Sequence, residues 1–595
     1  MSRHAVRHTS ELDRILAAPR RVWTRQSAEA LVEPISSILR LPRGQQTLRP
    51  HQAQVLSDAY QVGGSVSSIP VSGGKTHITY LLPTVQGSRR PLLITQGSLI
   101  SSGKTAAEFA KIAEHWRSPA NPIEMVSYQY LASVAAEDYL ARGGYDNLIL
   151  DEGHHARNVD TAVAKRIDRY LVARAEAGAK TCVNVMTGTI YRKSPRNIAH
   201  LMAWALGDLA PLPWKSANDM RLWCDALDWR VKPGARLRPG AILQLARGWL
   251  APEKLKALLT EDATYVPEYA LKIARLALQR WMAETPGIII VDESDCDKPL
   301  NIRFRMLPLD PVLEETFQNF RATEETPDGW KMVDSIARYS HENEIQSGFY
   351  HIIDPRPPAP WATARREMIA FVRQRIQDSA QDPKPLDTEK QVFLRYPGAP
   401  QIAAWKEIRD TFKPNSVPVW LSASVLHWAA NWLRENSPAL VWVQHLAVGD
   451  MLSRLTGIPF FSAEGRAPDG SSIVDLRPPA SAILSIHALR EGFNLPYWSR
   501  NAVLGWPQPA DQCEQMIGRT HRTGQANAVS FDVPVLSGAT LRAFQMAYSE
   551  AAQVREAFGQ TQKLLNATID TSELAGYEAL MREQSRYVYK PDAPT

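Results

Sequence analysis

The sequence predicts an α/β protein with two parallel-sheet lobes, a helical region between them and helical extensions at both ends. Short apolar runs alternate with helical stretches over residues 47–205, and the same alternation returns over 415–540. Apolar runs flanked by helices are typical of strands that a parallel sheet buries on both faces. Helical patterns interrupted by prolines dominate 206–414, which we interpret as an insertion and a linker to the second lobe.

The strands expected in the two lobes are short and apolar. In the first lobe they are 91–94, 123–126, 147–150 and 182–186. In the second lobe they are 440–443, 482–485, 502–504 and 528–533.

The two ends of the chain lack this alternation. Residues 1–46 form an N-terminal extension with helical patterns at 11–18 and 28–41, and 541–595 form a helical C-terminal tail. A chain of 595 residues is long enough for such a division into several domains.

Composition indicates a folded soluble protein, with 44% apolar and 22% charged residues. No apolar run reaches the length that crosses a bilayer, and the N-terminus lacks the apolar stretch of a signal peptide, so we expect no membrane association. The four cysteines are scattered, which favours reduced thiols in a cytoplasm. Alanine- and arginine-rich usage favours a bacterial or phage-infected host cytoplasm. The net charge of +6 is a mild bias towards a polyanionic partner.

A glycine-containing loop precedes the apolar helix expected at 77–82. A phosphate-binding loop needs a tight glycine turn with exposed backbone N–H groups, a lysine for the β- and γ-phosphates and a hydroxyl for Mg²⁺. Gly73, Gly74, Lys75 and Thr76 supply these groups. A second segment, 101–105, carries Gly103-Lys104-Thr105 and is locally almost as good.

Two carboxylates follow the strand expected at 147–150. Asp151, at the carboxyl end of this strand, can hold Mg²⁺, and Glu152 can polarise or deprotonate an attacking water. A zinc site at His154-His155 is disfavoured, because adjacent histidines face differently and no third ligand is near. A similar pair, Asp292-Glu293, follows the apolar run at 288–291. For that pair we favour a buried strand that ends in a solvated acidic turn.

The segment 515–525 reads Gln-Met-Ile-Gly-Arg-Thr-His-Arg-Thr-Gly-Gln. Arg519 and Arg522 are three residues apart, so on a helix they project from one face. This string resembles motif VI of the Swi/Snf-like branch of superfamily 2 helicases and translocases. The resemblance implies two RecA-like lobes. It also implies that Arg519 and Arg522 act in catalysis by reaching across a cleft to the γ-phosphate of ATP, and that Gln515 belongs to the nucleotide site.

Other segments resemble further motifs of this family. Asp151 to His154 is similar to the DEAH box, with Gly153 in place of alanine, and 91–100 is similar to motif Ia. Residues 48–52 resemble the adenine-reading element, which assigns Gln52 to the nucleotide and favours Lys75 over Lys104. The family usually has glycine where this chain has Ser72, which we count among the nucleotide-binding residues.

Two segments resemble the elements that couple the ATP site to the nucleic-acid path. Thr187-Gly188-Thr189 follows a strand and is similar to motif III, although the next residue is Ile190 where the family usually has proline. Residues 485–495 are similar to motif V, where Gly492 permits close approach of the backbone to phosphate.

The resemblance implies a DNA-stimulated ATPase that uses ATP and Mg²⁺, the latter held by Asp151 and Thr76. We expect a translocase on double-stranded DNA, with single strands as a further substrate. One alternative is a strand-separating DNA helicase of the DEAH type, and another is a non-hydrolysing nucleic-acid-binding scaffold. The resemblance covers 47–205 and 415–535, and the remainder of the chain matches no motif.

Overall fold

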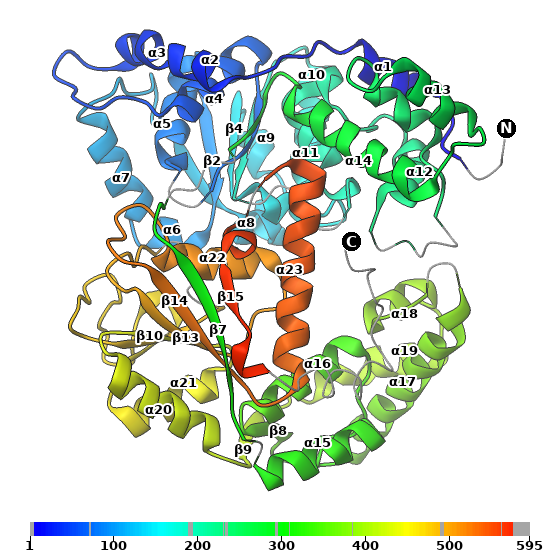
Figure 1. The fold of residues 1–595 in the computed structure, drawn as a ribbon, viewed down its shortest axis with the longest axis vertical. Helices are drawn as coiled ribbons and strands as arrows, with labels where there is room; N and C mark the ends of the chain where they lie inside the picture. Colours follow the sequence, from blue (N-terminus) through cyan, green and yellow to red (C-terminus); the bar gives the residue numbers. More distant parts are fainter. Residues whose placement is uncertain are drawn as a thin grey trace. The chain divides into compact units, whose positions relative to one another are not determined.

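The structure is a computed structural model of the chain. It describes residues 5–70, 73–188, 194–229, 231, 236–291, 296–308, 310–382, 385–487, 493–560 and 562–574. The chain divides into two compact units. The first comprises Met1–Asp295 and Glu550–Leu565, and the second comprises Cys296–Ser549 and Asn566–Thr595. Each unit contains a parallel sheet, so the predicted α/β class with two parallel sheets is confirmed (Figure 1).

The first unit contains a sheet of six parallel strands in the order β3-β2-β4-β5-β1-β6. The strands are β1 (Ser65–Ser68), β2 (Pro91–Thr95), β3 (Glu124–Ser127), β4 (Asn147–Asp151), β5 (Cys182–Thr187) and β6 (Ile288–Ile290). Register places Ser68 opposite Thr187, and Asp151 opposite Met186. The carboxyl ends of β1, β4 and β5 therefore lie together at one edge of the sheet.

The helices of the first unit connect these strands or precede them. They are α1 (Ser10–Ala17), α2 (Arg25–Ala30), α3 (Val32–Leu39), α4 (Pro50–Val62), α5 (Lys75–Val85), α6 (Gly97–Ser101), α7 (Lys104–Ala113), α8 (Tyr128–Ala132), α9 (Tyr139–Gly143), α10 (Ala162–Glu176), α11 (Arg196–Leu206), α12 (Ala217–Leu227), α13 (Pro252–Thr260) and α14 (Pro267–Ala283).

Both faces of this sheet are buried. Leu148 and Leu150 of β4 pack in one apolar cluster with α10, α11 and α14, whereas Ile149 packs in another with α4, α5 and α7. Successive side chains of a strand point to opposite faces, so a continuous apolar run is what two helical layers require (Figure 1).

The second unit contains a sheet of seven parallel strands in the order β11-β12-β10-β13-β14-β7-β15. The strands are β7 (Leu300–Met306), β10 (Leu440–Val443), β11 (Phe460–Phe461), β12 (Ala482–Ser485), β13 (Arg500–Leu504), β14 (Val529–Val535) and β15 (Thr568–Asp570). A separate antiparallel pair joins β8 (Phe349–Ile353) to β9 (Ser416–Trp420).

The helices of the second unit are α15 (Pro311–Thr323), α16 (Ser335–Gln346), α17 (Ala359–Asp378), α18 (Glu389–Arg395), α19 (Pro400–Ile408), α20 (Ser424–Asn436), α21 (Leu446–Thr456) and α22 (Ala510–Thr520). Of these, α17, α18 and α19 lie between β8 and β9 in the sequence. Two more, α23 (Gly538–Phe558) and α24 (Lys563–Asn566), include residues assigned to both units.

The buried strand expected at 288–291 is confirmed as β6. Strands also form in segments that were expected to be helical, because β7 lies in the region 206–414 and β15 lies in the C-terminal tail. β7 pairs with β14 over seven residues, and Arg303 of β7 forms an ion pair with Asp532 of β14, with an N–O distance of 2.8 Å. The region 206–414 therefore contributes a strand to each sheet.

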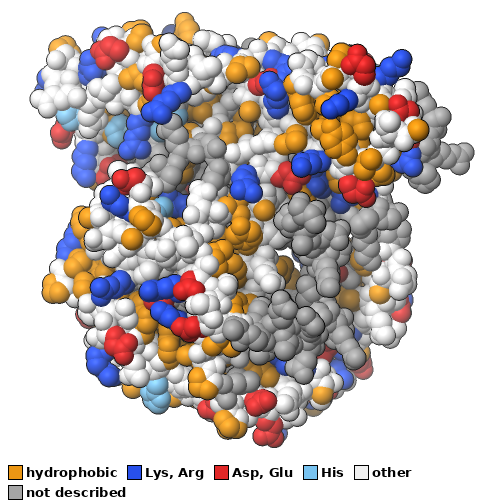
Figure 2. All heavy atoms as spheres, viewed as in Figure 1, with side chains coloured by type: hydrophobic (Ala, Val, Ile, Leu, Met, Phe, Trp, Pro, Cys, Tyr) orange, Lys and Arg blue, Asp and Glu red, His pale blue; other side chains and the backbone are white. Residues whose placement is uncertain are grey.

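The described helices do not include one that is both long and apolar enough to cross a membrane. On the face shown in Figure 2, lysine and arginine side chains are interspersed with acidic ones. That distribution agrees with the modest net charge of +6.

Candidate functional site

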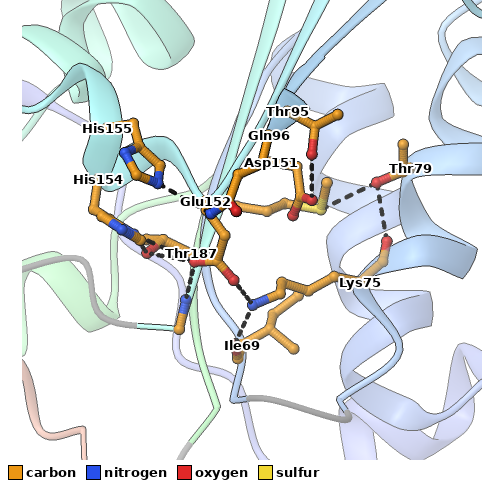
Figure 3. Close-up of polar contacts among 12 residues, drawn as sticks. Ile69, Lys75, Thr79, Thr95, Gln96, Asp151, Glu152, His154, His155 and Thr187 are labelled. Atoms are coloured by element: carbon orange, nitrogen blue, oxygen red, sulfur yellow. Dashed lines mark hydrogen bonds and ion pairs between the residues drawn. The ribbon is translucent and has the colours of Figure 1, made fainter. Parts of the chain in front are cut away.

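Polar residues from four strands of the first unit converge at the carboxyl edge of its sheet. They lie at or just beyond the ends of β1, β2, β4 and β5, and Figure 3 shows their side chains directed toward one another. Ligands of open α/β sheets bind outside the carboxyl ends of the strands, at such an edge. The residues predicted from the glycine loop and the acidic pair are therefore brought together.

The glycine loop after β1 leads directly into α5. Gly74 has φ of 78°, and a Cβ atom there would lie 2.2 Å from Nε2 of Gln52. A Cβ on Gly73 would lie 2.3 Å from Cγ2 of Ile69. Position 74 thus favours glycine because of its backbone conformation, and position 73 does so because of its close contact with the Ile69 side chain. Ser72 lies outside the described residues.

Two side chains at the start of α4 contact the backbone carbonyls of this loop. The amide Nε2 of Gln52 donates to the Gly74 carbonyl at 3.2 Å, and Nε2 of His51 lies 2.7 Å from the Gly73 carbonyl oxygen. Oε1 of Gln52 accepts from the backbone N–H of Arg49 at 2.8 Å. In this structure Gln52 therefore positions the loop, and its predicted contact with adenine stays a prediction.

Lys75 and Glu152 form an ion pair at the centre of the site. Nζ of Lys75 lies 2.7 Å from Oε1 of Glu152 and 3.5 Å from the carbonyl oxygen of Ile69. The two side chains are only 14% and 17% exposed. An ammonium group held at the first residue of α5 adds to the positive end of the helix dipole, so this position favours an anion.

Glu152 has an unusual backbone and several partners. Its φ of 49° lies in the left-handed region, where strain is frequent at functional sites. Its Oε2 lies 3.3 Å from Nδ1 of His154 and accepts from the Gly188 N–H at 3.4 Å. Burial favours the neutral acid, but Lys75 and His154 outweigh it and hold the pKa of Glu152 well below its usual value. Glu152 is therefore a carboxylate here.

Asp151 occupies the end of β4, beside the loop. Its Oδ2 accepts from the Thr95 hydroxyl at 3.1 Å, and its backbone carbonyl accepts from the Tyr128 hydroxyl at 2.8 Å. Thr76 is the second residue of α5 and is half-buried. A carboxylate and a hydroxyl are the oxygen donors that suit Mg²⁺, which keeps waters and takes phosphate oxygens as its other ligands. The described residues contain no group of three or more acidic, histidine or cysteine side chains suited to a metal.

His154 has a structural role that was not predicted. It is buried, and its Nδ1 lies 3.2 Å from the Thr187 hydroxyl as well as near Glu152. The His154 ring packs at 4.4 Å from that of His155, which in turn contacts Gln96. Thr187, predicted as a coupling residue, thus contacts Glu152 directly at 3.5 Å and also through His154. Gly188, the second predicted coupling residue described, contacts Glu152 through its N–H. Thr189 lies outside the described residues.

Gln560 is another contact that the sequence analysis missed. It belongs to the part of the C-terminal segment that folds with the first unit, and its amide Nε2 donates to the Gly188 carbonyl. The same Gly188 donates its N–H to Glu152. The segment carries no motif, so only the three-dimensional fold brings Gln560 to the site.

The alternative loop at Lys104 lacks the geometry of the first. The helix α6 separates it from β2, whereas the first loop directly follows β1. The segment at Lys104 is therefore one helix removed from the carboxyl end of its strand. A Cβ atom on Gly103 would meet no atom within 4 Å, so no close approach requires glycine there beyond its φ of 67°. These features favour Lys75. The alternative acidic pair, Asp292-Glu293, lies outside the described residues.

Gly153 occupies the position where the DEAH box has alanine, and we predict that Gly153→Ala destabilises the protein. A Cβ atom there would lie 2.5 Å from Cγ1 of Val185, which is fully buried. Overpacking of this kind costs about 1–3 kcal/mol. Thermal or urea unfolding measures the loss, and Gly153→Ala should cost less in a Val185→Ala background. An equal loss in both backgrounds would contradict the clash.

The predicted arginine pair in the second unit differs from the expected helical arrangement. α22 ends at Thr520, so Arg519 lies on the helix and Arg522 lies beyond it. His521 leaves the helical conformation with ψ of 85°, and Nε2 of Gln525 donates to the Thr520 carbonyl at 3.1 Å. The expectation that one helix face presents both arginines is therefore wrong, because this turn closes the helix first.

The two guanidinium groups nevertheless converge. Nη1 of Arg519 donates to the Phe493 carbonyl at 2.7 Å, and Nη1 of Arg522 approaches the same oxygen at 3.5 Å and the side chain of Asn494. Both arginines are buried within the second unit. Gln515 is half-buried on α22, and Gly492 lies outside the described residues.

Comparison with known proteins assigns no family. No protein-family model matches the chain, and no curated protein matches it.

Proposed function

We propose that the chain is a nucleic-acid-stimulated ATP hydrolase that acts as a translocase on double-stranded DNA. The observation that carries the proposal is the ion pair between Lys75 and Glu152, 2.7 Å long, at the carboxyl edge of a parallel sheet. Gly73 and Gly74 form the turn that leads into the amino end of α5, and the amino end of a helix favours phosphate. A parallel sheet in each unit agrees with two RecA-like lobes.

The first unit offers groups that suit the phosphates of a nucleoside triphosphate and its Mg²⁺ ion. The loop and the amino end of α5 hold the phosphates, and Lys75 neutralises the β- and γ-phosphates. Asp151 and Thr76 would hold Mg²⁺, which neutralises charge on the phosphate oxygens when bound.

Binding of ATP changes the partners of Glu152. A phosphate draws the Lys75 ammonium group to itself, which weakens the ion pair that holds the pKa of Glu152 low. The carboxylate becomes a better proton acceptor and keeps its contacts with His154 and Gly188. Glu152 can then orient and deprotonate the attacking water.

The experiment that tests the proposal compares ATP turnover without nucleic acid and with single-stranded DNA, duplex DNA and RNA. We expect the greatest stimulation with duplex DNA and a steep decline with salt, because phosphate contacts dominate binding that reads no sequence. A triplex-displacement assay beside a strand-displacement assay separates a translocase from a DEAH-type helicase. ATP binding without turnover under all conditions would refute the hydrolase and favour a scaffold.

For Arg519 and Arg522 we propose the role that the resemblance implies, stabilisation of charge on the γ-phosphate during hydrolysis. Arg522→Ala should lower stimulated turnover at least about tenfold with nucleotide affinity largely kept. Arg519 shares the Phe493 carbonyl with it and remains in the variant, which limits the loss. Arg500→Ala, a change on β13 outside this arginine pair, serves as the control. Unchanged turnover in Arg522→Ala would contradict the role.

A further inference from the structure

The helical part of the second unit contains a cavity that none of the motifs explains. It has a volume of about 380 Å³ and is bordered by residues of α17, α18 and α19. A small apolar core of its own, formed around Met368, Ile369 and Val372 of α17, supports this region. The cavity is large enough for one small planar ligand.

One wall of the cavity is aromatic and rigid. Trp361 is 2% exposed, and its indole N–H donates to the Arg409 carbonyl at 3.1 Å. The Trp405 ring meets Trp361 edge to face, with centroids 4.9 Å apart, and is itself half-buried at the cavity. A half-exposed indole that is held by a second one provides a stacking surface at little entropic cost.

Four charged side chains line the cavity: Arg409 and Asp410, which form an ion pair at 3.5 Å, and Arg365 and Glu389. The Arg365 guanidinium carbon lies 4.7 Å from the ring centroid of Trp330 and 5.2 Å from that of Trp361. In the described part of the chain, neither the Arg365 nor the Glu389 side chain forms a hydrogen bond or an ion pair within 4 Å, although the Glu389 backbone N–H donates to Asp334. Burial lowers the pKa of Arg365 and raises that of Glu389. Arg365 and Glu389 attract each other without a direct hydrogen bond, so a ligand that offers acceptors to Arg365 and donors to Glu389 would satisfy both groups.

We propose that this cavity binds an unstacked guanine base. The base stacks on Trp405, Glu389 accepts hydrogen bonds from its N1–H and N2–H groups, and Arg365 donates to its O6 and N7 atoms. The inference goes beyond the proposed function, because a motor that follows the phosphate backbone needs no base contact. Guanine binding also does not depend on ATP hydrolysis.

The charges distinguish guanine from other ligands. A cationic ligand such as a methylated lysine is disfavoured, because the Arg365 guanidinium already covers the Trp330 and Trp361 rings. Among the DNA bases, guanine presents two neighbouring N–H donor groups for both oxygens of a carboxylate. It also presents two acceptors that match a guanidinium group.

The test measures binding of the full chain, without ATP, to fluorescently labelled thymidine strands that carry one guanine, one hypoxanthine or neither. Hypoxanthine lacks only the 2-amino group that Glu389 is proposed to bind. We expect the guanine strand to bind about tenfold more tightly than the hypoxanthine strand, and the strand with neither base to bind more weakly than both, because hypoxanthine keeps the stacking face, N1–H, O6 and N7. Competition with free dGMP shows whether the site also takes a nucleotide outside a strand. Equal affinity for the three strands would overturn the proposal.

Protein variants separate the base contact from general binding. Glu389→Gln should bind the guanine and hypoxanthine strands equally, and Trp405→Ala should weaken binding of the guanine strand about tenfold through lost stacking. Glu407→Gln removes an exposed carboxylate of α19 that does not line the cavity and should change nothing. Retained discrimination in Glu389→Gln, or binding of a trimethyllysine peptide through Trp405 in place of guanine, would refute the assignment. Loss of ATPase activity alone would refute only the proposed function.

Discussion

Replacing Lys75 with alanine should lower ATP turnover at least about 10²- to 10³-fold, whereas Lys104→Ala should leave turnover unchanged. Lys75 is the first residue of a helix that begins at the carboxyl edge of the sheet, and its ammonium group lies beside Glu152. Lys104 is also the first residue of a helix that follows a glycine, but this helix follows α6 and no buried strand. Phosphate release under saturating ATP and duplex DNA provides the measurement.

Both variants remove a lysine from the first residue of a helix that follows a glycine, so a difference between them reports the position of the lysine in the fold. Lys75→Ala also leaves Glu152 without its main counter-charge, so its folding has to be checked by thermal unfolding. Adding Glu152→Gln to Lys75→Ala removes the unpaired carboxylate and should restore stability without restoring turnover. Loss of activity in Lys104→Ala with activity kept in Lys75→Ala would assign the phosphate loop to the second segment.

Much of the fold follows from local sequence patterns, and the exceptions have physical causes. The apolar runs at 91–94 and 147–150 form β2 and β4, because helices bury both of their faces. β1 reads Ser-Val-Ser-Ser and has no apolar run, yet it is buried, and the Ser65 hydroxyl donates to Asn184 at 2.9 Å. A polar strand of this kind is not recognisable before its neighbours are known.

Strands that join distant segments are equally hidden. β7 carries Arg303 and Arg305 in alternation, which in isolation resembles a solvated segment. Both arginines bind Asp532 of β14, more than two hundred residues further along the chain. The ion pairs and the parallel register identify β7 as a strand of the second sheet, and neither is visible in a local window.

The candidate site shows the same division. Lys75 and Glu152 could be predicted because each follows a strand or loop with its own local pattern. Gln560 could not, since 372 residues separate it from Gly188, whose carbonyl it contacts. Arg522 was placed on a helix because spacing alone does not reveal that the Gln525 side chain closes the turn at Thr520.

The variant Glu152→Gln should bind ATP with nearly the affinity of the parent protein and hydrolyse it about 10²- to 10⁴-fold more slowly. Glutamine keeps the shape of the side chain, and its single amide oxygen can still accept from Lys75, whereas the Gly188 N–H loses its acceptor. It cannot accept a proton from water, because a neutral amide is not a base at neutral pH. The loss should therefore appear in turnover and not in nucleotide affinity.

A fluorescent ATP analogue measures affinity in this variant, and single-turnover phosphate release measures hydrolysis apart from product release. Glu108→Gln, a change to a half-exposed carboxylate of α7 in the same unit, is the matched control and should alter neither value. A variant that loses affinity and turnover together would place Glu152 among the groups that hold the nucleotide. Unchanged turnover with ATP bound would exclude Glu152 as the residue that activates water, and the hydrolytic centre would then have to be sought away from the end of β4.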